Sequence, residues 1–337
     1  MSLVTYHPDL DTQFSRYGIQ IPIADERASK TFALVAAEFS SLCQKADLEL
    51  IKPLGREDLL LVHQRDFIER LFDRETASSE IIKAFELKTE SGEYHRYDPT
   101  SATVDLLEML PSVLLQGGAS YYAMERALED GFHYFLGGGM HHAMSFGGRG
   151  FCLINDIVIG LKKLQKEEKI KTAWVIDVDA HKGDGTAELT ASDSSISTLS
   201  IHMAKGWPLD GPQLDSRGEL RPQFIASDVD IPVLPINQDS YNMLLEEGLY
   251  ELEEQHATPE LCIIVHGADA YEGDQLASTH HLNLTLEQLK ERDQLLDRFL
   301  LEREIPRVYL MAGGYGGQSY RVYTQFLKGI LPDFLDD

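Results

Sequence analysis

The chain shows two spacings of hydrophobic residues. Short apolar runs of the kind that forms buried strands occur at residues 3–6, 133–136, 172–179, 196–202, 229–233, 261–265 and 307–311. Longer stretches with apolar residues three or four apart predict helices, at residues 25–47, 57–72, 101–130, 151–165, 238–255, 285–302 and after 317. Strands that alternate with helices of this length predict an α/β fold, mainly a parallel sheet sandwiched by helices.

The alternation continues along the whole chain, and residues 75–97 alone read as a polar surface segment with weak periodicity. The sequence contains no linker, internal repeat or low-complexity tract. A length of 337 residues is compatible with one large α/β unit. We therefore predict a single domain over residues 1–337, with its active site at the C-terminal ends of the strands, where open α/β sheets bind ligands.

The densest polar segment follows the strand at residues 172–179. Asp177, Asp179 and His181 are two residues apart, so their side chains share one face in extended structure. Burying two carboxylates and an imidazole together is costly unless a positive charge lies beside them, and a divalent metal is the simplest candidate. For this segment alone, a strand end with solvated acids is an equally good interpretation.

Other strand ends carry polar residues as well. Asp269 follows the strand at residues 261–265, and its carboxylate would complete a three-ligand site with Asp179 and His181. Such a site leaves a coordination position open, as catalytic metals require. The ligand set fits Zn²⁺ and does not exclude Fe²⁺ or Co²⁺.

A glycine-rich segment at residues 137–139 precedes two adjacent histidines, His141 and His142. Each needs an acid that fixes its tautomer, and Asp177 and Asp184 are available nearby for this role. Tyr315 lies between glycines after the last strand and could donate a hydrogen bond to a developing oxyanion. Taken singly, the histidines could equally be structural and the tyrosine part of a turn.

Composition narrows the classes of partner. The formal charge of −25 argues against direct nucleic-acid binding and attracts cationic substrates, although acidic charge often serves solubility alone. Cys43, Cys152 and Cys262 are isolated in apolar contexts, as in reduced cytosolic proteins. The first residues do not resemble a secretion signal, and no 18-residue apolar run occurs. We predict a cytoplasmic protein without a membrane span.

Four segments occur in a fixed order: GGGMHH at residues 137–142 with GFC at 150–152, DVDAHKGDG at 177–185, GADAYEGD at 267–274, and GGYG at 313–316. In this order they resemble the signature segments of the zinc-dependent histone deacetylase family. That family includes acetylpolyamine amidohydrolases and acetoin-utilisation proteins and shares the arginase fold. The resemblance covers roughly residues 50–325, and four ordered motifs are far more specific than one.

The resemblance implies an amidohydrolase that removes acyl groups, acetyl or longer, from N-acyl-lysine of proteins or peptides. It implies that zinc is bound by Asp179, His181 and Asp269. His142 would be the general base assisted by His141, with Asp177 and Asp184 orienting the two histidines. Tyr315 would polarise the amide carbonyl.

The resemblance also implies a narrow substrate tunnel, lined by Gly150, Phe151, Trp207 and Leu276. It further implies a structural potassium ion near the strand that carries Asp177, bound by Asp177, Asp179, His181, Ser200 and Ile201. The sequence departs from many members at Ala180 and Lys182, a pattern typical of bacterial and class IV-like members. Residues 18–27 replace the usual entry loop, which leaves the acyl length and the amine carrier open.

Three other functions compete with lysine deacylation. The first keeps the chemistry and acts on acylated polyamines or other small acyl amides. An arginase-like ureohydrolase would need further aspartates near Asp269, and residues 267–271 offer only that one. A non-catalytic acyl-lysine binder would not need the full set of ligands, histidine–aspartate pairs and tyrosine. A homo-oligomer is compatible with all of these.

Overall fold

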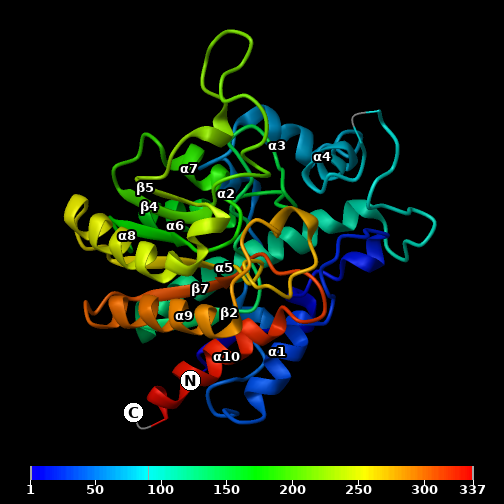
Figure 1. Ribbon diagram of the computed structural model, residues 1–337. Coiled ribbons are helices and arrows are strands. Elements are labelled where there is room, and N and C mark those ends of the chain that lie inside the picture. The colour runs from blue at the N-terminus through cyan, green and yellow to red at the C-terminus, as the bar shows by residue number, and fades with distance from the viewer. Residues whose placement is uncertain (1, 90, 336–337) are drawn as a thin grey trace.

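The computed structural model describes residues 2–89 and 91–335 and contains a seven-stranded sheet, all of whose neighbouring strands run parallel (Figure 1). The strand order is β1-β2-β7-β6-β3-β4-β5. The strands are β1 Val4–Thr5, β2 Phe132–Phe135, β3 Ala173–Asp177, β4 Ile196–Met203, β5 Val229–Val233, β6 Leu261–His266 and β7 Arg307–Met311. The predicted parallel α/β fold is confirmed, and every predicted strand is present.

Helices cover both faces of this sheet. They are α1 Arg27–Ala36, α2 Arg56–Leu59, α3 Arg65–Phe72, α4 Ala77–Ala84, α5 Met109–Asp130, α6 Asp156–Lys166, α7 Asp184–Thr190, α8 Tyr241–Gln255, α9 Leu286–Leu301 and α10 Tyr320–Ile330. One face packs against α1, α8, α9 and α10, and the other against α5 and α6. None of the described helices combines the length and the apolar character that a membrane span requires.

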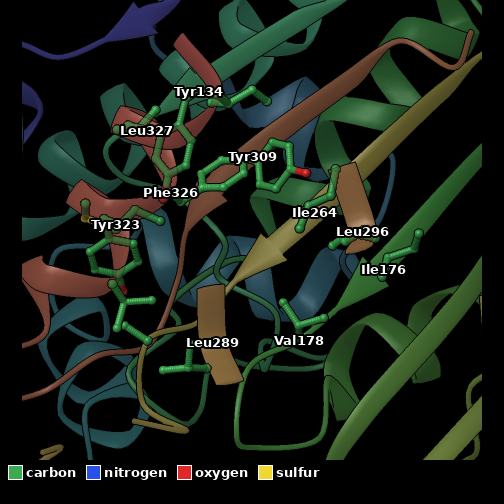
Figure 2. Close-up of a cluster of buried hydrophobic side chains, with 14 of the residues drawn as sticks. Tyr134, Ile176, Val178, Ile264, Leu289, Leu296, Tyr309, Tyr323, Phe326 and Leu327 are labelled. Carbon is green, nitrogen blue, oxygen red and sulfur yellow. The ribbon is translucent and has the colours of Figure 1, made fainter. Parts of the chain in front are cut away.

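Alternation along the strands assigns side chains to the two faces. Ile176 of β3 and Ile264 of β6 pack with Leu296 of α9 and Phe326 of α10 in the cluster drawn in Figure 2. Val175, the neighbour of Ile176, belongs instead to the cluster beneath α5 and α6. Full burial of each such aliphatic side chain stabilises the fold by about 1.5–3 kcal/mol. The sheet is therefore a rigid base for whatever its strand ends carry.

Two predicted helices are shorter than their apolar patterns. The helix expected at residues 25–47 ends at Ala36, because the chain turns back and the Leu42 carbonyl accepts a hydrogen bond from the Leu3 backbone N–H beside β1. The helix expected at 57–72 is divided into α2 and α3. Between them the buried His63 accepts a hydrogen bond at Nε2 from the Asn155 backbone N–H, which holds the chain in a turn.

The segment predicted as surface, residues 75–97, contains α4, which the sequence analysis missed. Ile81 and Phe85 are buried in a third hydrophobic cluster that also contains Phe67 of α3. The same cluster includes Leu276 and Tyr315, which lie in the loops that follow β6 and β7. α3 and α4 therefore pack against the loops at the C-terminal edge of the sheet.

Candidate active site

Four neighbouring strands supply the site. β2, β7, β6 and β3 are consecutive in the sheet, so the segments that follow them lie at one edge. Among the described residues, one group of potential metal ligands is found there: Asp179, His181 and Asp269. One ligand atom from each lies within 4.8 Å of the others, and all three side chains are buried. The arrangement leaves space on the side of the tunnel described below.

The hydrogen bonds of His181 suit a metal ligand. Its Nδ1 lies 2.9 Å from Asp269 Oδ2 and 3.4 Å from Asp179 Oδ1, while Nε2 lies 3.1 Å from Ser278 Oγ. With a metal bound, a proton on Nε2, donated to Ser278, would leave the Nδ1 lone pair for the ion. Burial alone would lower the pKa of His181, but the two carboxylates raise it to about 10. The pocket therefore favours a positive charge, which fits a divalent cation.

The backbone fixes the two carboxylates. Gly313 N–H donates to Asp179 Oδ2 at 2.9 Å, and Ala180 N–H donates to Asp269 Oδ1 at 2.9 Å. A Cβ atom on Gly313 would lie 2.4 Å from Asp179 Oδ2 and 2.9 Å from Asp269 Oδ2. Glycine at this position is therefore required for the close approach of β7's exit loop to the carboxylates.

The two adjacent histidines are each paired with an aspartate. His141 Nδ1 donates to Asp177 Oδ2 at 2.6 Å, and His142 Nδ1 donates to Asp184 Oδ1 at 2.7 Å. The imidazole rings are 3.9 Å apart between centroids, and all four side chains are buried. In both pairs the proton on Nδ1 leaves Nε2 free to face the pocket.

The pKa values of the two histidines diverge. Burial opposes a charge on His141, but Asp177 and then Asp179 raise its pKa to about 9. Burial, the neighbouring His141 and His181 hold the pKa of His142 well below its usual value. Hence His141 carries a positive charge near neutral pH while His142 is neutral, which divides the pair into a cation and a base.

Tyr315 lies at the same end of the pocket. Its backbone N–H donates to Asp274 Oδ2 at 2.7 Å. Burial, followed by the charges of Asp269 and Asp179, raises the pKa of the Tyr315 phenol well above its usual value. The phenol therefore stays protonated and can only act as a hydrogen-bond donor to an anionic oxygen.

A pocket with a volume of about 100 Å³ leads to this group. All four predicted tunnel residues, Gly150, Phe151, Trp207 and Leu276, line it. A second cavity of about 110 Å³ adjoins it and shares His142, Phe151 and Tyr315 with it; Arg27, which also lines this cavity, donates to the Gly314 carbonyl at 2.9 Å. The pocket lining also includes residues that the sequence analysis did not name: Glu86 and Arg96 at the mouth, and Ser278 beside His181.

The sequence analysis also missed two arginine contacts near the site. Arg292 of α9 is fully buried and donates from Nη1 to the carbonyls of Val178 and Gly267, at 3.1 and 3.0 Å. It thereby ties together the ends of β3 and β6 that carry the two carboxylates. Arg149 lies 3.0 Å from Asp184. A signal for Arg149 existed, because it is the one charged residue in a run of glycines beside a motif, whereas Arg292 looked like an ordinary helical residue.

The residues predicted to bind potassium lie on β3 and β4 and the loop after β3. Asp177 pairs with Ser200 in the β3–β4 register, and Ser200 Oγ lies 3.4 Å from the Gly183 N–H. Lys182, which departs from the family pattern, is buried and forms an ion pair with Asp230 of β5 at 2.7 Å. Potassium binding stays a prediction.

The fold and this constellation define a class of hydrolase, and comparisons agree with it. The sequence model described as "Histone deacetylase domain" matches residues 22–329. The chain belongs to the histone deacetylase family, whose members are typically metal-dependent. The match begins earlier than the resemblance seen from the motifs, which started near residue 50, so part of the altered entry loop lies within it.

The chain is similar to named members from bacteria and plants. It is 29% identical over 290 residues to acetoin utilization protein AcuC of Staphylococcus aureus (strain COL), covering 83% of this chain and 69% of that protein. It is 27% identical over 286 residues to histone deacetylase 2 of Arabidopsis thaliana, covering 83% and 67%. An uncharacterized protein of Picosynechococcus is 30% identical over 200 residues, covering 59% and 61%.

Proposed function

We propose that this protein is a zinc-dependent amidohydrolase that removes acyl groups from N-acyl-lysine of proteins or peptides, and that residues 1–337 form one catalytic domain. The observation that carries the proposal is the pair of histidines, each hydrogen-bonded to a buried aspartate, beside three converging ligands at an aromatic-walled tunnel. The family gives the reaction class, hydrolysis of an acyl amide.

Asp179, His181 and Asp269 would hold the zinc ion. When bound, zinc supplies Lewis-acid chemistry, polarising the amide carbonyl and lowering the pKa of water. His142 Nε2 takes the proton from the attacking water, since Asp184 fixes the opposite nitrogen as a donor. The same nitrogen then delivers the proton to the leaving amine.

The remaining residues stabilise charge. Asp177 holds His141 as a cation beside His142. This positive charge stabilises the negative charge that develops on the oxygen atoms of the tetrahedral transition state. The Tyr315 phenol donates a hydrogen bond to the former carbonyl oxygen. Removing one such donor in comparable sites costs about 10²–10³ in kcat.

The tunnel supports a substrate with a thin alkyl stem. Phe151 and Trp207 line it, and a lysine side chain presents such a stem. Acylated polyamines or other small acyl amides are the alternative substrates, because they carry the same stem. At the mouth, Glu86 forms an ion pair with Arg96 at 3.1 Å, and the pair carries no net charge. A neutral mouth does not select a cationic amine, so a peptide carrier is favoured.

Several broader properties belong to the same proposal. The protein acts in the cytoplasm, contacts neither membrane nor nucleic acid directly, and binds K⁺ near Asp177, with Ser200 and Ile201 among the ligands. Fe²⁺ or Co²⁺ could replace zinc with the same ligands. A homo-oligomer is compatible with the proposal. An arginase-like site is disfavoured, since the described residues offer one group of three ligands at this edge.

The test combines metal analysis with a substrate panel. Purified protein is expected to hold one zinc ion per chain and to deacylate a fluorogenic acyl-lysine. Asp179→Ala is expected to lose zinc and activity together, and His142→Ala to lose activity with zinc retained. The panel varies acyl length on lysine peptide, free lysine and polyamine carriers. If zinc-loaded wild type cleaves no acyl amide in the panel, the proposed function is wrong.

A further inference from the structure

Arg149 contacts the carboxylate that orients the base. Asp184 is fully buried, and its Oδ1 accepts the hydrogen bond from His142 Nδ1. Its other oxygen, Oδ2, accepts no hydrogen bond of good geometry from the described residues and lies 3.0 Å from Arg149 Nη1. A buried carboxylate without a compensating charge is strongly destabilised. The Arg149 guanidinium is therefore the group that balances Asp184 on the side away from His142.

The same guanidinium contacts the tunnel wall. Its central carbon lies over the Trp207 ring, 5.2 Å from the centroid. The Trp207 ring in turn meets His142 edge to face, with centroids 4.5 Å apart. His142, Asp184, Arg149 and Trp207 thus form a closed circuit of contacts, in which one arginine joins the tunnel wall to the partner of the base.

The backbone holds Arg149 in this place. Arg149 and Cys152 exchange two backbone hydrogen bonds of 2.9 Å, forming a tight turn. Gly150 within the turn has a φ of +56°, and a Cβ there would lie 2.2 Å from Trp207 and 2.7 Å from His142. The turn is pressed against the site, so the direction of the Arg149 side chain is set by the fold.

We propose that Arg149 is a positioning residue, which keeps Asp184 ionised and aligned on His142 and couples this alignment to the occupancy of the tunnel. The inference rests on the proposed amidohydrolase function. Arg149 is about one quarter exposed, so water partly screens the ion pair in the free protein. A substrate stem packed on Trp207 holds the ring against which the guanidinium lies, which keeps Arg149 aligned on Asp184 in the state that reacts.

The experiment compares Arg149→Gln, Arg149→Lys and a matched control, Arg217→Gln, whose arginine is exposed in the loop between Leu214 and Leu220. In zinc-loaded protein, Arg149→Gln is expected to lower kcat about 10- to 100-fold with KM changed less than about threefold. Arg149→Lys keeps the charge and should recover part of kcat. The control should match wild type.

A second readout does not depend on turnover. The chain has two tryptophans, and Trp174 is buried in the sheet core, so removing the guanidinium should change the emission of Trp207 alone. Arg149→Gln is expected to alter tryptophan emission with zinc content and melting temperature close to wild type.

The proposal fails if Arg149→Gln retains kcat within about twofold of wild type, or if kcat falls only as far as zinc or folded protein is lost. Equal loss in Arg149→Lys and Arg149→Gln with unchanged emission would also overturn it. Inactive wild type would refute the proposed function instead, and the emission change would still report on the contact between Arg149 and Trp207.

Discussion

The ligand group and the tunnel mouth are built in opposite ways. Asp179 and Asp269 follow central strands, are almost completely buried, and accept backbone hydrogen bonds. Glu86 and Arg96 at the mouth lie in loops, with side chains 36% and 29% exposed. Chemistry that depends on fixed distances rests on the sheet, whereas the surface that meets the amine carrier rests on loops that can change without disturbing it.

The mouth also contains strained backbone. Five described residues other than glycine have positive φ angles, and three of them, Glu86, Arg96 and Phe151, line the tunnel. Left-handed backbone at such residues costs on the order of 1–3 kcal/mol each and clusters at functional sites. The Glu86–Arg96 ion pair and the Arg96 guanidinium, 5.5 Å from the Phe151 ring, hold these loops together.

The largest effect is expected from a substitution beside the buried ligand group. Asp177→Asn should keep zinc, because Asp177 is not one of the three converging ligands, yet lose about 10²–10⁴ in kcat as His141 loses the carboxylate that holds it charged. Zinc analysis and single-substrate kinetics measure the two properties separately. Asp239→Asn, at an exposed position, serves as control. Full activity in Asp177→Asn would contradict the assignment of the His141–Asp177 pair.

The next test removes the arginine contact that joins the strand ends carrying the ligands. Arg292→Met removes the donor to the Val178 and Gly267 carbonyls. It also takes the guanidinium away from the buried Asp293, now 2.8 Å from Arg292 Nε, and leaves it beside the His266 ring at 3.1 Å. Stranding a buried charge in this way costs about 3–5 kcal/mol, measured by urea unfolding. Arg298→Met, on the exposed side of the same helix, should change stability by less than about 0.5 kcal/mol. Equal effects would show that the contact is dispensable.

A pH series tests whether His141 is charged in the folded protein. The folded-state pKa of His141, about 9, exceeds the ordinary value of 6.5, so its contribution to stability is complete below about pH 6.5 and is lost as pH rises through 9. In zinc-free protein, wild type and His141→Gln should therefore differ in the pH dependence of unfolding by about 3 kcal/mol between pH 6 and 10. Parallel curves would mean that His141 is not charged in the folded protein.

The smallest effects are expected at the mouth. Glu86→Gln and Arg96→Gln each remove one partner of a partly exposed ion pair, so stability should change by less than about 1 kcal/mol. The ratio of kcat/KM for polyamine and peptide carriers should move in opposite directions in the two variants, by up to about fivefold. Glu86→Gln leaves a positive mouth and disfavours polyamines. Shifts in the same direction would exclude a charge effect.

The comparison also explains what the sequence could predict. Strands such as residues 229–233 and helices such as 285–302 have a regular apolar pattern, and the structure contains both within a residue or two. The gathering of His142, Asp179 and Asp269 follows from topology, since parallel strands end at one edge. Elements and site residues whose positions follow from the sheet could therefore be predicted from the sequence.

Features that depend on loops could not be predicted from the sequence. α4 was missed because its buried residues face a small cluster made by distant loops, so its apolar stripe is narrow. Ser278 reaches His181 through a turn after β6, and nothing in a local pattern marks that contact. Arg149 stands only seven residues from His142, but its partner Asp184 is far along the chain. Such contacts are set by the tertiary path of the loops.

The strand order has a consequence for biosynthesis. Among the strands of the described residues, β7 is the last in chain order, yet it lies between β2 and β6 in the middle of the sheet, and its exit loop supplies Gly313 and Tyr315. A nascent chain that has not reached residue 311 has a gap where those strands must join. Parallel pairing over such long separations is slow to form. We therefore expect metal binding and turnover to appear together, and only after β7 has paired with β2 and β6.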